Sequence, residues 1–124
     1  MEPQDSTAIT GYHAHVYYDE AARERAASVR EEIGRLFDVR MGRWREEPVG
    51  PHPQAMYQVA FAAAQFERIV PWLMLNRQGL TILVHPETGD DVADHEVYPL
   101  WLGEKLDLDI ETLRAILASG ATGA

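Results

Sequence analysis

Five histidines carry the chemistry that this sequence offers. His13 and His15 form a His-x-His pair in a segment rich in aromatic and β-branched residues, which predicts a strand. Alternate residues of a strand face the same way, so the two imidazoles are expected about 6 to 7 Å apart on one face, within reach of one ion. His52 lies in a proline-rich link, His85 ends another predicted strand, and His95 follows in an acidic loop. None of the five falls in a predicted helix.

The absence of cysteine narrows the metals that such a site could hold. Neutral imidazole suits Zn, Cu, Ni and Fe, and histidines that leave coordination positions open, with or without a carboxylate, are typical of non-haem Fe(II) oxygen chemistry. A structural zinc would fill its four positions with protein, whereas histidines in loops beside prolines favour a catalytic ion. Nine of the twenty acidic residues fall between positions 87 and 111, so most of them are expected to be solvated. Those that could complete a metal site are Glu87, Asp90, Asp91 and Asp94.

Arginines and aromatic residues are the candidates for holding an organic substrate. The forked donors of arginine suit a substrate carboxylate, and Arg77 and Arg43 are the candidates for that role. Tyr17, Trp72 and Trp101 could wall an aromatic pocket. The alternative for each of these side chains is ordinary packing in the core or on the surface.

Length, charge and composition exclude several classes of protein. A chain of 124 residues is long enough for one domain with its own core. The net charge of −9 disfavours nucleic acid as a partner, and the lack of cysteine excludes disulfide scaffolds, zinc ribbons and thiol nucleophiles. The longest apolar stretch, Ile69 to Leu75, has seven residues, whereas a membrane helix needs about 20, so no membrane partner is expected. The acidic start of the chain does not resemble a signal peptide, and we expect a cytoplasmic protein.

Hydrophobic periodicity predicts strands and helices in the order β, α, β, β, α, β. The expected strands cover residues 12–18, 37–44, 55–61 and 80–85. The expected helices run from Asp19 to Arg35 and over 62–78, where Pro71 should kink or restart the second helix. This order predicts an α+β fold of the ferredoxin-like βαββαβ type, an antiparallel sheet with both helices on one face. We expect a flexible arm over 1–10, a single domain over 11–118 and a frayed tail over 119–124.

The helix-free face of such a sheet needs cover. A C-terminal extension is expected to supply part of it through an amphipathic helix capped by Asp109 and through four residues that pack back on the sheet: Val97, Leu100, Trp101 and Leu102. A homodimer is predicted to cover the remainder.

Several of these segments together resemble the DOPA 4,5-dioxygenase family. The resemblance spans roughly residues 11 to 110. It is most specific in the combination of a Gly-Pro-His-Pro block at 50–53 with a His-Pro-Glu-Thr-Gly-Asp block at 85–90. The His-x-His strand, the Pro-Trp-Leu and Asn-Arg segments within 71–77, the Asp-His pair at 94–95 and the Leu-Trp-Leu-Gly segment at 100–103 complete it.

The resemblance implies a small extradiol dioxygenase, often dimeric, that uses Fe(II) and O₂ to open the ring of a catechol such as DOPA; zinc could replace iron in a crystal. In this interpretation His15, His52 and His85 are the predicted metal ligands, and His13 and His95 are the predicted acid/base residues. No acid stands out as a third ligand, so both a site of three histidines and a site of two histidines with one carboxylate stay open.

The same interpretation assigns substrate binding to Arg77, Arg43 and Tyr17. Two other functions stay open. One is a non-catalytic, dimeric ferredoxin-like module that binds a small aromatic ligand or zinc. The other is a metal-dependent isomerase or hydrolase on the same scaffold, because a fold does not fix its chemistry.

Overall fold

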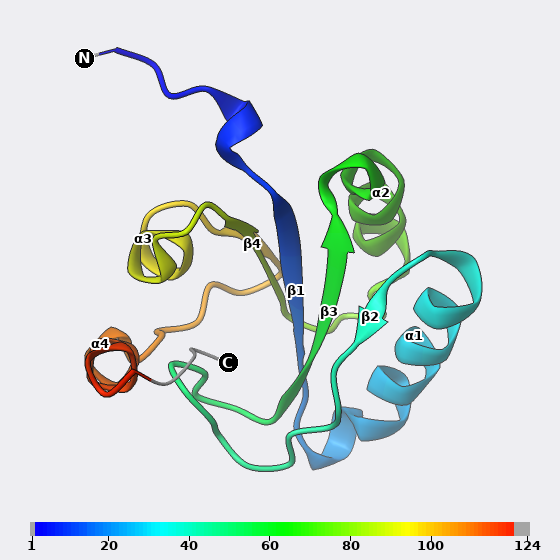
Figure 1. Ribbon diagram of the computed structural model, residues 1–124. Coiled ribbons are helices and arrows are strands. Elements are labelled where there is room, and N and C mark those ends of the chain that lie inside the picture. Colours follow the sequence, from blue (N-terminus) through cyan, green and yellow to red (C-terminus); the bar gives the residue numbers. More distant parts are fainter. Residues whose placement is uncertain (1, 121–124) are drawn as a thin grey trace.

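A five-stranded antiparallel sheet organises the protein (Figure 1). The structure is a computed structural model that describes residues 2–120. Its strands are β1 (Gly11–Tyr17), β2 (Arg40–Met41), β3 (Met56–Ala62), β4 (Ile82–Glu87) and β5 (Leu100–Leu102). They lie side by side in the order β2-β3-β1-β4-β5. The predicted α+β class and antiparallel sheet are confirmed.

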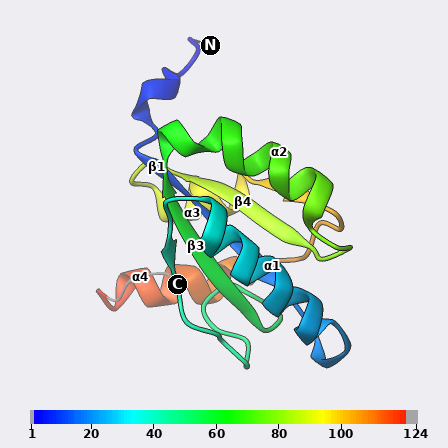
Figure 2. The same ribbon diagram turned by 90° about the vertical axis from the view of Figure 1, so that its right-hand side faces the viewer.

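Helices lie on both faces of this sheet. On one face are α1 (Arg23–Leu36) and α2 (Phe66–Asn76), and on the other are α3 (Asp91–Glu96) and α4 (Ile110–Ala118) (Figure 1 and Figure 2). Short 3₁₀ helices at Ser6–Ala8, Glu20–Ala22 and Ala63–Gln65 precede β1, α1 and α2. Within residues 2–120, no helix combines the length and hydropathy that a membrane crossing requires.

The face toward α1 and α2 carries the larger apolar core. Ala14 and Val16 of β1 are fully buried in one cluster with Val29 of α1 and Leu73 of α2. The alternation of β1 residues therefore places its small and branched side chains on this face, as predicted, and leaves the other face to the histidines. Asp19 begins the first helical segment, because its carboxylate accepts a hydrogen bond from the N–H of Ala22.

The opposite face carries a smaller apolar cluster at one end of the sheet. Tyr17, Met56 and Leu83 form its buried part, and Trp101 and Leu108 are among the residues that pack against it. The C-terminal segment thus covers this face, as expected. Because α3 and α4 also lie there, they cover part of the face whose exposure motivated a homodimer, and the dimer stays a prediction.

Only Trp101 of the four residues expected to pack on that face does so. Alternation along β5 sends Leu100 and Leu102 to the other side of the sheet, where Leu102 joins the larger core. Leu100 is 39% exposed and Val97, which follows α3, is 66% exposed. The prediction for these three residues was wrong because it did not include a fifth strand.

The edge strand β2 is shorter than the strand predicted over 37–44. It has a pairing partner on one side only, and it pairs with β3 over two residues. Farther along, the chain contacts β3 at intervals, through a 2.7 Å hydrogen bond from the Gly42 N–H to the Gln58 carbonyl and through a bridge between Arg45 and Met56. A side chain at Gly42 would place a Cβ 3.1 Å from that carbonyl oxygen, so glycine permits the close approach.

Two helices depart from expectation. α2 begins later than predicted and continues through Pro71 without a restart; proline removes one backbone donor, and the rest of the helix is retained.

α3 occupies a stretch expected to be a loop. Its first turn is acidic and Asp90 caps it by accepting a hydrogen bond from the Ala93 N–H, features that stabilise a helix N-terminus. His95 therefore lies in a helix, contrary to the prediction that no histidine would.

The two ends of the chain have separate outcomes. Within the predicted arm, Asp5 accepts a hydrogen bond from the Thr7 N–H at the first 3₁₀ helix. The Thr10 N–H donates to the Glu87 carbonyl at 3.0 Å, where β1 begins. The last four residues of the predicted frayed tail, 121–124, lie outside the described residues. The domain boundaries stay predictions.

The docking of α4 depends on one fully buried side chain. Leu113 is the buried residue of this helix, and Asp109 caps it as predicted. We expect Leu113→Ala to lower the free energy of unfolding by about 2 to 4 kcal/mol, through lost burial and the cavity left behind. Urea unfolding followed by circular dichroism measures this change. The exposed Arg114→Ala should stay within about 0.5 kcal/mol of wild type, and equal losses in both variants would contradict the packing described for α4.

Candidate functional site

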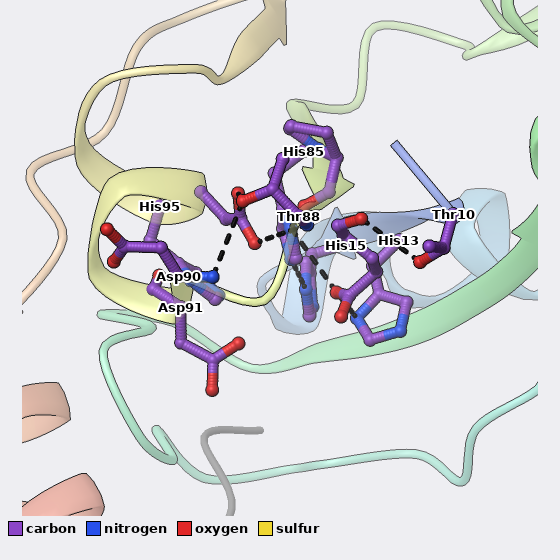
Figure 3. Close-up of polar contacts among 11 residues, drawn as sticks. Thr10, His13, His15, His85, Thr88, Asp90, Asp91 and His95 are labelled. Carbon is purple, nitrogen blue, oxygen red and sulfur yellow. Dashed lines mark hydrogen bonds and ion pairs between the residues drawn. The ribbon is translucent and has the colours of Figure 1, made fainter. Parts of the chain in front are cut away.

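Strand register brings three histidines together on one face of the sheet. His13 of β1 is paired directly with His85 of β4, and His15 follows two residues along β1 on the same face. Figure 3 shows the three side chains projecting from these neighbouring strands. The Nε2 atoms of His15 and His85 lie 3.1 Å apart, and the His13 ring centroid is 5.1 Å from that of His85.

Two more histidines reach this group from outside the sheet. His52 comes from the loop before β3, where its backbone N–H donates to the Val49 carbonyl at 3.1 Å. The centroid of its ring lies 4.1 Å from that of His15. His95 comes from α3, and its ring centroid lies 4.1 Å from that of His85 (Figure 3). All five histidines that the sequence singled out therefore form one cluster.

Hydrogen bonds at Nδ1 fix which ring nitrogens keep a lone pair. His95 Nδ1 donates to the Asp91 carbonyl at 2.7 Å and His85 Nδ1 donates to the Pro86 carbonyl at 3.0 Å. The Nε2 atom of each ring is then unprotonated in the neutral form. His95 Nε2 is buried and has no hydrogen-bond partner among the described residues, and the same holds for His15 Nδ1.

Burial keeps these imidazoles neutral. It lowers the pKa of His85 to about 3, with the neighbouring His95 adding to the effect. It also lowers the pKa of His13 to about 4, again with contributions from His95 and from the positive charge of Arg40. The pKa of His15, which is fully buried among the other rings, falls well below its ordinary value of 6.5. Neutral imidazoles are the form that binds a metal ion.

The donor set fits a divalent metal ion. Two trios of histidines each bring one ligand atom per residue within 4.8 Å of one another: His13, His15 and His85, and His15, His52 and His95. Two nitrogens bound to the same ion at about 2.1 Å would lie about 3 to 3.4 Å apart, which matches the 3.1 Å between His15 and His85. His15 belongs to both trios, and the predicted ligand set of His15, His52 and His85 combines members of the two.

Glu87 is a carboxylate in contact with two of the histidines. Its Oε1 lies 3.1 Å from His13 Nδ1 and 3.7 Å from His85 Nδ1. Burial, together with Asp91 and Asp94, raises the pKa of Glu87 to about 7. Because the pKa of His13 is lowered, its ring is neutral, and its contact with Glu87 is a hydrogen bond and not a bond between two full charges.

The other acidic candidates have local structural partners. Asp94 is buried and accepts hydrogen bonds from the Thr88 N–H and hydroxyl at 3.0 and 2.6 Å, and Asp90 caps α3. Glu87, Asp91 and Asp94 do bring one oxygen each within 4.8 Å of one another. Figure 3 shows Asp91 of this trio on the same side of the cluster as His95.

Tyr17 supports the cluster from its buried end. Its hydroxyl lies 2.7 Å from His52 Nδ1, and its ring stacks on Trp101 with the centroids 6.1 Å apart. Tyr17 is 1% exposed, so burial raises its pKa and keeps the phenol neutral. The structure thus places Tyr17 and Trp101 beside the histidines, whereas Trp72 packs against Phe37 in the core on the other face.

An open pocket of about 570 Å³ adjoins the cluster at His13. Glu87, Ala60 and Arg40 are among the residues that line it. Arg40 pairs with Ala60, which pairs in turn with His13, so all three side chains lie on the histidine face of the sheet. Sequence reasoning missed this arginine, although its alternation with Val39 and Met41 in the predicted strand was the signal that could have found it.

The structure does not bring the two predicted arginines to this pocket. Arg77 lies at the opposite end of β4, where its guanidinium donates to the Leu80 carbonyl at 2.8 Å. Arg43 follows β2 and is exposed, and it is not part of the pocket lining.

Comparison with known proteins identifies the family. The family model described as the Dopa 4,5-dioxygenase family matches residues 12–112. The chain belongs to this family. The resemblance noted from the motifs is confirmed, and family membership supports a dioxygenase-like function.

Three similar proteins illustrate the relationship. A crystal structure of a "putative dioxygenase" from Nostoc punctiforme is 60% identical, with a TM-score of 0.91, and the match covers 92% of this chain and 99% of that one. An uncharacterized 21.2 kDa protein from Botryotinia fuckeliana is 38% identical over 93% of this chain and 69% of its own length. DOPA 4,5-dioxygenase from Amanita muscaria is 31% identical over 85% of this chain. The match spans half, 50%, of the Amanita protein.

The lowered histidine pKa values predict that the metal-free protein loses stability in mild acid. Below pH 6.5 both histidines are protonated in the unfolded chain. In the folded protein His13 stays neutral down to about pH 4 and His85 down to about pH 3. Each such histidine removes up to about 1.4 kcal/mol of stability per pH unit. Glu87 opposes this, because its raised pKa favours the folded state as the pH falls from about 7 to 4.5. The histidines together outweigh this one carboxyl.

Urea unfolding in the presence of a chelator, between pH 7 and 4.5, measures this dependence. The midpoint should fall with pH in wild type, and less steeply in His85→Gln. An unchanged or rising midpoint in wild type would contradict the assignment of neutral, buried imidazoles.

Proposed function

We propose that this protein is a non-haem, metal-dependent extradiol dioxygenase that opens the ring of a catechol such as DOPA with O₂, with Fe(II) as its metal. The observation that carries the proposal is the convergence of five histidines on one sheet face, two of them with buried and unpartnered ring nitrogens. Cysteine is absent, so the donors at this site are imidazoles with carboxylates beside them, and histidine ligands suit iron. Membership of the family supports the reaction class.

The trio His13, His15 and His85 is the proposed metal site. It borders the open pocket through His13, whose side chain is 21% exposed, so a substrate could approach an ion held there. The second trio is buried at all three residues and borders a smaller pocket, of about 230 Å³, through His95. A catalytic ion needs positions open to substrate, which favours the trio that contains the partly exposed His13. In this proposal His13 replaces the predicted ligand His52.

Glu87 and Pro86 orient two of these ligands. Glu87 Oε1 lies 3.1 Å from the Nδ1 of His13, and the Pro86 carbonyl accepts a hydrogen bond from the Nδ1 of His85, so Nε2 is the nitrogen that keeps a lone pair in both neutral rings. Such outer partners fix the tautomer and orientation of metal-binding histidines. Glu87 therefore acts as a positioning residue in a site of three histidines.

A bound Fe(II) would supply the Lewis-acid and redox chemistry that combines a catechol with O₂. Proton movement falls to His95, whose Nδ1 is committed to the Asp91 carbonyl and whose unpartnered Nε2 can take a proton from a substrate hydroxyl and later return it. This matches the acid/base role predicted for His95. Tyr17 and Trp101 stack on each other beside the cluster, and Tyr17 packs there with the buried Met56 and Leu83.

We also propose a ferredoxin-like core, a cytoplasmic location and a homodimer. The order β2-β3-β1-β4 and the placement of α1 and α2 on one face support the first. The unpaired side of edge strand β5 and the exposed side chains of Val97 and Leu100 beside it support the third. Light scattering that gives twice the mass of one chain at micromolar concentration would support the dimer, and a single-chain mass would contradict it.

Oxygen uptake tests the proposed reaction. We expect protein reconstituted anaerobically with Fe(II), then mixed with air-saturated buffer and a panel of catechols including DOPA, to consume one O₂ per catechol and form a yellow ring-opened product. Protein without metal is the control. If Fe(II) binds stoichiometrically and no catechol is consumed, the dioxygenase proposal fails, and a ligand-binding module or a non-oxidative metal enzyme takes its place.

Single glutamine variants separate ligands from the proton carrier. His13→Gln, His15→Gln and His85→Gln should each lose bound metal, whereas His95→Gln should keep it and lose about 10²- to 10⁴-fold in kcat. Metal content by mass spectrometry and O₂ uptake are the measurements. Full metal content in His13→Gln and His85→Gln, with metal lost from His52→Gln and His95→Gln, would contradict this assignment and place the ion at the buried trio.

A further inference from the structure

Arg40 is a positively charged side chain that lacks a partner beside the proposed site. Ion pairs within residues 2–120 engage three of the ten arginines: Arg23 with Glu46, Arg35 with Glu32 and Arg114 with Glu111. Arg40 makes no ion pair or hydrogen bond through its side chain within the same residues, although Asp38 and Glu87 line the same pocket. Arg40 is exposed, so its guanidinium donors are accessible from the pocket.

The position of Arg40 is set by the sheet. The residue pairs with Ala60, which pairs with His13, so two strand spacings of about 4.8 Å separate the backbones of Arg40 and His13. Ala60 lies between them on the same face, and its methyl group leaves space above the sheet. An aromatic ring next to His13 would fit over Ala60 with its substituent directed toward Arg40.

We infer that Arg40 is a specificity-determining residue that binds a carboxylate on the substituent of an aromatic substrate whose ring lies at His13. That the ring is a catechol rests on the proposed function. That the substituent carries a carboxylate rests on the position of Arg40 in the pocket. Arginine presents paired N–H donors that match a carboxylate, and such charge-assisted hydrogen bonds are stronger than neutral ones. A neutral catechol would bind without this contact.

Anaerobic titration calorimetry on the Fe(II)-loaded protein tests the inference without turnover. The two probes are 3-(3,4-dihydroxyphenyl)propanoate and 4-methylcatechol, which share the ring and differ in the carboxylate. We expect Arg40→Gln to weaken binding of the acid by about 10- to 100-fold and binding of 4-methylcatechol by less than about twofold. Arg40→Lys should recover part of the loss.

Matched variants give the comparison its controls. Arg114→Gln makes the same change in net charge on α4, at a side chain whose ion-pair partner is Glu111, and should leave both affinities unchanged. Binding of 4-methylcatechol also reports that Arg40→Gln is folded. Arg43→Gln and Arg77→Gln test the two arginines that the sequence suggested, and a selective loss there would overturn the inference.

The remaining outcomes separate this inference from the proposed function. An unchanged affinity for the acid in Arg40→Gln, equal losses for both probes, or failure of the wild type to bind the acid more tightly would overturn the role of Arg40. A selective loss of binding in a protein that consumes no O₂ would support Arg40 and overturn the dioxygenase. O₂ uptake with both probes, without a selective loss of binding in Arg40→Gln, would support the dioxygenase and overturn the role of Arg40.

Discussion

The register of β1 against β4 is the constraint on which the site depends. Pairing of His13 with His85 puts both imidazoles on one face, and His15 joins them two residues along the strand. Because side chains alternate in a strand, a slip of one residue would turn the histidines of β1 into the apolar core and bring Ala14 and Val16 to the site. The apolar residues of β1 thus protect the register that assembles the site.

Burying the histidine rings removes their nitrogens from water, and hydrogen bonds with neighbouring groups offset part of this cost. Imidazoles packed this closely are stable together only while they are neutral, and the lowered pKa values of His13, His15 and His85 express that condition. Backbone carbonyls and Glu87 accept hydrogen bonds from the Nδ1 atoms, and Tyr17 bonds His52. A metal ion bound by the free lone pairs would remove most of the remaining penalty.

Patterns local to one segment predicted much of this structure. The two faces of β1, the cap of Asp19 and the amphipathic α4 all follow from residue spacing, and the resemblance of motifs predicted the family. The five histidines were selected by type and position, and the structure brings all of them together. What the sequence does not show is which of them could hold an ion together, because that depends on distances between segments far apart in the chain.

The predictions that were wrong or incomplete also depend on contacts between distant segments or on elements too short to show a pattern. His95 was placed in a loop because the six residues of α3 are too few to show an apolar period, and its helix is stabilised by Asp90 at the cap. Arg77 was selected for its residue type, but its turn precedes β4 at the far end from the site. Arg40 was passed over because alternation shows only that it faces away from Val39 and Met41, and the pairing of β2 with β3 is what places it on the face of His13.

Anomalous diffraction from crystals loaded with Fe(II) without oxygen tests the central claim most directly. We predict a single iron peak bonded to ring nitrogens of His13, His15 and His85, with open positions toward the pocket that Arg40 lines. A peak among His15, His52 and His95, a peak at Glu87, Asp91 and Asp94, or no peak at full iron loading would contradict it.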